Sequence, residues 1–138
     1  MLAMNRRDRV AMHATLNGAL GALSQAVRLS RLGAFGLDAT WLPVTWHVDL
    51  KSASVMLRRA AQDASDRKND SPMRPGGVQL ALLDNAATLR DIATRLERTA
   101  ADPDADTGDW ADLHNRAEQE YQRLWGQRDL MRALFPVD

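Results

Sequence analysis

The chain has 138 residues, about the length of one domain. It carries 18 basic and 18 acidic residues, and 45% of its residues are hydrophobic. This composition is too apolar for an intrinsically disordered chain and too charged for a membrane protein. Cysteine does not occur. The sequence therefore excludes a disulfide scaffold, a cysteine-type zinc finger, an iron–sulfur cluster and a cysteine nucleophile.

The chain strongly prefers one of the two basic residues and one of the two acidic residues. Arginine outnumbers lysine 16 to 2, aspartate outnumbers glutamate 15 to 3, and alanine occurs 22 times. We interpret this bias as the mark of GC-rich codons rather than of function. It indicates a bacterium or a phage as the source.

The first residues do not have the pattern of a signal peptide. Arginines precede residue 10, but His13, Asn17 and Gly18 interrupt the apolar core that a signal peptide requires. No run approaches the roughly 20 apolar residues that span a bilayer. We therefore expect a cytoplasmic protein without a membrane partner.

The segment from about residue 5 to residue 32 has the spacing of an amphipathic helix. Its large apolar side chains recur every three or four residues and fall on one stripe: Leu16, Leu20, Leu23 and Val27. Gly33 and Gly36 follow, and such glycines favour the end of a helix. The first helix is therefore predicted over 5–32.

Two further segments show the same period. Residues 46–68 carry a stripe made of Leu50, Ala53, Leu57, Ala60 and Ala64. Residues 78–101 carry one made of Leu82, Ala86, Leu89, Ala93, Leu96 and Ala100. Two prolines and a glycine pair in 69–77 interrupt the helical pattern, so we expect a loop there.

The fourth helix is predicted over residues 109–135, with Asp109 as its N-terminal cap and Pro136 after its end. Only 40–48 resembles a strand, and Pro43 interrupts it. Long helices joined by short connections favour an antiparallel up-down-up-down bundle. We therefore predict an all-α four-helix bundle that forms a single domain over 1–138.

Such a bundle would gather aromatic and histidine side chains at one end. The ends of the first and third helices would lie beside the starts of the second and fourth. The residues brought together there are Trp41, Trp46, His47, Trp110 and His114. They form either a cap over the core or the lining of a small-ligand pocket. A ligand-binding or enzymatic bundle is therefore one alternative function.

A second feature is a stripe of small residues on the first helix. Its members recur every three or four residues, and Gly21 adjoins them: Ala11, Ala14, Gly18, Ala22 and Ala26. A glycine inside a helix costs about 1 kcal/mol relative to alanine, so a close approach of another helix should offset that cost. The approaching helix belongs either to the same chain or to a second copy, which would make a homodimer.

Charge is distributed unevenly along the chain. Residues 1–31 contain five arginines and one aspartate, whereas residues 102–138 contain four arginines and nine acids. The arginines of the first helix could contact phosphates, which makes nucleic-acid binding a further alternative: Arg6, Arg7, Arg9, Arg28 and Arg31. The overall neutrality argues against a dedicated nucleic-acid binder.

No motif for catalysis or cofactor binding is present. The sequence contains no nucleophile elbow, P-loop or dinucleotide fingerprint. His114 and Glu118 share a helical face, but the paired Glu-x-x-His motifs of di-iron bundles are missing. We therefore predict no catalytic residues, metal or cofactor. The sequence favours a non-enzymatic interaction, regulatory or assembly protein.

Overall fold

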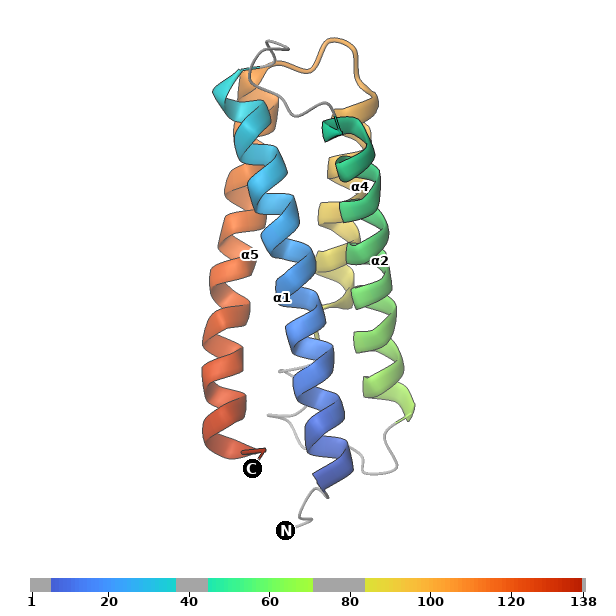
Figure 1. Cartoon of the computed structure of the whole chain (residues 1–138), viewed down its shortest axis with the longest axis vertical. Helices are drawn as coiled ribbons and strands as arrows, with labels where there is room; N and C mark the ends of the chain where they lie inside the picture. The colour runs from blue at the N-terminus through green and yellow to red at the C-terminus, as the bar shows by residue number, and fades with distance from the viewer. Residues whose placement is uncertain (1–5, 37–44, 71–83, 138) are drawn as a thin grey trace.

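The computed structural model describes residues 6–36, 45–70 and 84–137, without the side chains of 68–70. The described residues form four helices and confirm the predicted all-α bundle (Figure 1). They are α1 (Arg6–Phe35), α2 (Trp46–Asp70), α4 (Ala86–Ala101) and α5 (Thr107–Leu134). In those ranges, no helix combines the length and the apolar character needed to cross a membrane.

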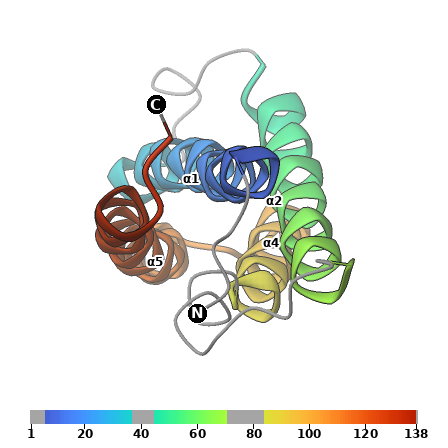
Figure 2. The ribbon, with the colours of Figure 1, turned by 90° about the horizontal axis from the view of Figure 1, so that it is seen from below.

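Helices that follow one another run in opposite directions (Figure 1). The first and last helices, α1 and α5, also run in opposite directions, as two hydrogen bonds between them show. Asn17 accepts from Arg128 at 3.1 Å, and the carbonyl of Val27 accepts from His114 at 3.1 Å. A later residue of α1 thus meets an earlier residue of α5. Seen along the bundle, α1 lies between α2 and α5, and α4 adjoins α2 (Figure 2).

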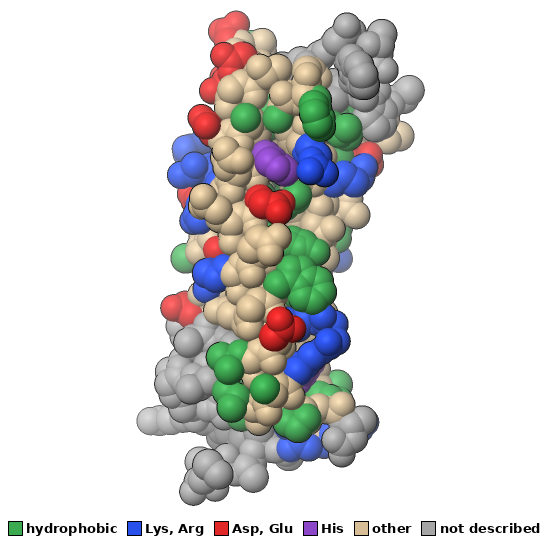
Figure 3. All heavy atoms as spheres, turned by 90° about the vertical axis from the view of Figure 1, so that its left-hand side faces the viewer, with side chains coloured by type: hydrophobic (Ala, Val, Ile, Leu, Met, Phe, Trp, Pro, Cys, Tyr) green, Lys and Arg blue, Asp and Glu red, His purple; other side chains and the backbone are tan. Residues whose placement is uncertain are grey.

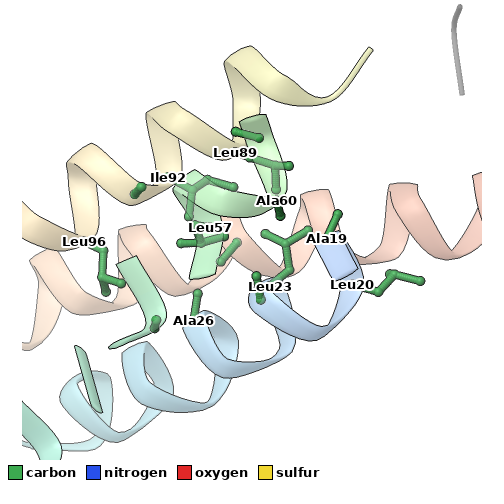
Figure 4. Packing of buried hydrophobic residues seen from close by; sticks show 14 of the residues in the cluster. Ala19, Leu20, Leu23, Ala26, Leu57, Ala60, Leu89, Ile92 and Leu96 are labelled. Carbon is green, nitrogen blue, oxygen red and sulfur yellow. The ribbon is translucent and has the colours of Figure 1, made fainter. Parts of the chain in front are cut away.

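The core consists mainly of leucine and alanine. Leu57 and Ala60 of α2 point between Leu23 of α1 and Ile92 of α4 (Figure 4). Small alanines beside large leucines allow the helices to interdigitate closely. The predicted stripes of the first three helices supply most of their part of this core: Leu16, Leu20, Leu23, Leu50, Ala53, Leu57, Ala60, Leu89, Ala93 and Leu96. The part from α5 consists of Trp110, Leu113, Ala117, Leu124 and Met131.

The first helix is longer than predicted. It continues through Gly33 to Phe35, and the turn is made at Gly36, whose φ is +155°. A glycine tolerates this angle because it has no Cβ. Gly33 lies inside the helix, where its lack of a side chain leaves room for the ring of Trp110. The ring in turn buries Gly33.

The third predicted helix begins later than expected. In the described residues, α4 starts at Ala86 with Asn85 at its N-cap, whereas the prediction placed the start at residue 78. Residues 78–83 of that prediction lie outside the described ranges. The Asn85 side chain does not cap α4 by a hydrogen bond, and its oxygen instead accepts from Arg123 of α5 at 2.9 Å.

The start of the fourth helix also differs. Asp106, not Asp109, is the N-cap of α5. The Asp106 side chain accepts from the Asp109 amide at 2.9 Å, and the Asp109 side chain accepts from the Asp106 amide at 3.1 Å. This reciprocal capping box satisfies two amides at once. Asp109 therefore helps to cap the helix from inside its first turn.

Candidate interaction surface

Two of the predicted pocket residues form the buried centre of one bundle end. The rings of Trp46 and Trp110 lie with their centroids 4.9 Å apart and their planes inclined by 58°. Trp46 donates from Nε1 to the carbonyl of Leu29 at 3.3 Å. Both tryptophans are at least 97% buried. Their contact ties the starts of α2 and α5 to the end of α1.

The two histidines of this end have different surroundings. His47 is exposed, and its ring centroid lies 5.1 Å from that of Trp46, with the two planes inclined by 70°. His114 is half-buried and donates from Nδ1 to the carbonyl of Val27. Trp41 lies outside the described residues. The structure therefore brings four of the five pocket candidates to one end, and the pocket itself stays a prediction.

Charged groups that pair across helices lie elsewhere. Arg58 of α2 donates to both carboxylate oxygens of Glu97 of α4, at 2.6 and 2.9 Å, and Ser54 donates to the same carboxylate. The hydrogen bonds from Arg58 hold the pKa of Glu97 below its usual range, and Glu97 raises the pKa of Arg58. This cluster joins two helices.

Among the described residues, no group of three acidic or histidine side chains could hold a metal ion.

The small residues of α1 divide into two sets. Ala22 and Ala26 are at least 99% buried in the core of the bundle. Ala14, Gly18 and Gly21 are exposed, and Ala11 is half-buried. A partner from outside can therefore reach only the part of the predicted interface that lies between residues 11 and 21.

Comparisons with known proteins add no relative. No family model, curated protein or solved structure matches this chain. The inferences about function below therefore come from the geometry and chemistry of the chain itself.

The exposed glycines of α1 stand in open space. Among the described residues, a Cβ placed on Gly18 or Gly21 would have no atom of another residue within 4 Å, apart from the neighbouring backbone of α1 itself. Packing within the chain therefore does not offset their cost of about 1 kcal/mol each. The contrast with Gly33 is direct, because a neighbouring ring fills the space beside that glycine.

A groove runs along each side of this exposed part of α1. The groove towards α2 has a volume of about 520 Å³ and is lined by Ala11, Ala14, Thr15, Asp63, Asp66 and Arg67. The groove towards α5 has a volume of about 640 Å³ and is lined by Val10, His13, Ala14, Asn17, Arg132, Pro136 and Val137. Ala14 borders both grooves. It therefore lies on a low ridge between two hollows, a shape that a second helix can contact closely.

The same part of α1 carries no formal charge. No Asp, Glu, Lys or Arg occurs between Arg9 and Arg28, although charged residues form 26% of the chain. The arginines considered for nucleic acid lie on either side of this gap, and Arg9 is half-buried. Depletion of charge is typical of the centre of a protein–protein interface.

The sequence analysis missed a third groove, which lies higher on the same side of α1 as α5. Its lining includes two aromatic residues, Tyr121 and Trp125, and two arginines, Arg28 and Arg31. The four-residue spacing of the rings and the three-residue spacing of the arginines were the available signals. They became informative only once the pairing of α1 with α5 was known.

Proposed function

We propose that this chain is a non-enzymatic interaction protein, a regulatory or assembly component that acts through protein–protein contacts. The first contact is a homodimer, formed by the outer face of α1 between Ala11 and Gly21. The contact is centred on Gly18 and Gly21. A two-fold arrangement brings the same small residues of both copies together.

The observation that carries this proposal is the open space around two glycines one helical turn apart, Gly18 and Gly21, within a stretch of α1 that has no charged residue. Gly126 also has open space, but it is a lone glycine between Arg123 and Arg128. Glycines allow two helix backbones to approach more closely than larger side chains would. The approach of a second copy then supplies packing contacts, and these offset the free energy that each glycine costs inside a helix. The absence of charged residues between Arg9 and Arg28 supports the same conclusion, because this part of α1 itself brings no ion that has to be desolvated.

We also propose a cytoplasmic location in a bacterium or a phage. The excess of arginine and alanine supports this origin. The proposed activity needs no cofactor, since it consists of association alone.

Light scattering of the purified chain tests the dimer. We expect a mass of twice 15.3 kDa at micromolar concentration. The Gly18→Leu variant should have the mass of one chain, because the larger side chain holds the two backbones apart. A wild-type protein that has the mass of one chain at every concentration would overturn the proposal.

Gly126 of α5 provides the matched control. It too is exposed, and a Cβ added to it would have no atom of another residue within 4 Å, with its own helix backbone set aside. Gly126→Leu should therefore keep the dimer. If both variants dissociate equally, the contact does not lie on α1. Circular dichroism confirms that each variant keeps its helices.

A further inference from the structure

The upper groove between α1 and α5 combines aromatic and charged side chains. It has a volume of about 560 Å³ and is lined by Ser24, Val27, Arg28, Arg31, Glu118, Tyr121, Gln122 and Trp125. Val27, Tyr121 and Trp125 are partly buried and pack against the core. The face on which α5 lies shows acidic, basic, histidine and hydrophobic side chains close together (Figure 3). The groove thus has an apolar floor and charged edges.

The α1 edge of this groove is basic and lacks acidic partners. Arg28 donates to the side-chain amide of Gln25 at 2.9 Å. Within the described part of the chain, neither Arg28 nor Arg31 has a carboxylate at ion-pair distance. By contrast, Arg58 and Arg116 both reach a carboxylate of α4. Because Arg28 and Arg31 are three residues apart on one helix, their side chains project from the same face.

The α5 edge of the groove carries the opposite charge. The carboxylate of Glu118 accepts from Gln122 at 3.2 Å, and no arginine or lysine of the described residues pairs with it. A ligand that fills the groove therefore meets cations on one side and an anion on the other. Glu118 therefore disfavours a ligand that is anionic along both edges, such as a nucleic-acid strand, and favours one whose anionic groups lie only along the edge that faces Arg28 and Arg31.

The aromatic floor also disfavours base stacking. The guanidinium of Arg128 lies over the ring of Trp125, 4.6 Å from the centroid. That cation occupies one face of Trp125, so a base could stack only on the other face of this ring or on Tyr121. The groove is therefore better suited to apolar side chains that insert between its edges than to a nucleic-acid strand.

We propose that the upper α1–α5 groove binds an amphipathic helix of another protein that has acidic side chains along one edge. Its carboxylates pair with Arg28 and Arg31, and its apolar side chains contact Tyr121 and Trp125. Two carboxylates one helical turn apart match the spacing of the two arginines. This surface differs from the α1 face between Ala11 and Gly21, so the inference holds with or without the dimer.

Selection from a phage-displayed library of random helical peptides tests the inference on the full chain. We expect the selected peptides to carry acidic residues one turn apart beside large apolar residues. Their affinity for Arg28→Ser/Arg31→Ser should fall by about tenfold, the effect of losing two paired charges at an interface. Arg59→Ser/Arg98→Ser is the control, because it removes two exposed arginines outside this groove.

Several results would overturn the inference. These are a selection that enriches no peptide, peptides without acidic residues, and peptides that bind the groove variant as well as the wild type. Displacement of the peptides by a single-stranded oligonucleotide at physiological salt would instead assign the groove to nucleic acid. Circular dichroism of both variants separates loss of binding from loss of fold.

Discussion

The indole ring of Trp110 lies directly against the backbone of Gly33. A Cβ on Gly33 would come within 2.5 Å of two atoms of that ring, which is closer than atoms can pack. Trp110 is 98% buried, so the ring has no solvent into which it could move. The glycine thus determines how closely the end of α1 approaches the start of α5.

Gly33→Ala should therefore lower the free energy of unfolding by about 1–3 kcal/mol, the usual cost of overpacking a core. Denaturant unfolding followed by circular dichroism measures the loss. Gly126→Ala is the control, because it has open space and should raise stability by about 0.5–1 kcal/mol. Equal effects of the two substitutions would show that Trp110 does not constrain Gly33.

A buried acid on α5 leads to the second prediction. Glu120 is 97% buried and pairs with Arg123, which also donates to Asn85 at the start of α4 at 2.9 Å. Arg123→Met should destabilise the fold by about 2 kcal/mol or more, because it leaves a buried carboxylate without its cation. Glu120→Leu should be nearly neutral, since it removes the buried charge itself. Chemical denaturation of both variants checks this order, and the reverse order would contradict it.

The pairing of Glu97 with Arg58 predicts a dependence of stability on pH. The hydrogen bonds from Arg58 lower the pKa of Glu97 in the folded state. The stabilisation is therefore complete above the ordinary glutamate pKa of about 4.3 and is lost as the pH falls through the lowered value. Both side chains are more than 40% exposed, so the contribution should stay below about 1 kcal/mol.

A double-mutant cycle of Glu97→Gln and Arg58→Gln measures this coupling. We expect a positive coupling energy at pH 7 that is smaller at pH 3, because protonation of Glu97 removes the charge that pairs with Arg58. A coupling energy that is the same at both pH values would contradict the assignment of the interaction to the carboxylate.

The fold was largely predictable because its signal is local. Leucine and alanine recur with helical spacing, so the stripes of Leu16 to Leu23 and of Leu50 to Ala64 identified core positions directly. Helix ends were less predictable. Glycine often ends a helix, but Gly33 lies inside α1 and is buried there. The ring of Trp110, which is distant in the sequence, packs against it.

The candidate surfaces depended on contacts that the sequence does not display. The small-residue stripe was visible, but its division into buried Ala22 and exposed Gly18 depends on how α1 sits in the bundle. Glu120 is an acid of the kind that usually faces solvent, and it is instead buried beside Arg123. The contact of Glu120 with Arg123 follows from their three-residue spacing on α5, whereas the burial of Glu120 depends on how α5 packs in the bundle.

Disulfide cross-linking of single-cysteine variants tests the central claim most directly, because the natural chain has no cysteine. A disulfide forms only when two Cα atoms approach within about 4.4–6.8 Å. The account predicts that Gly18→Cys or Gly21→Cys gives a linked dimer of twice 15.3 kDa much faster than Gly126→Cys does. If neither α1 variant is linked faster than Gly126→Cys, the outer face of α1 is not where two copies meet.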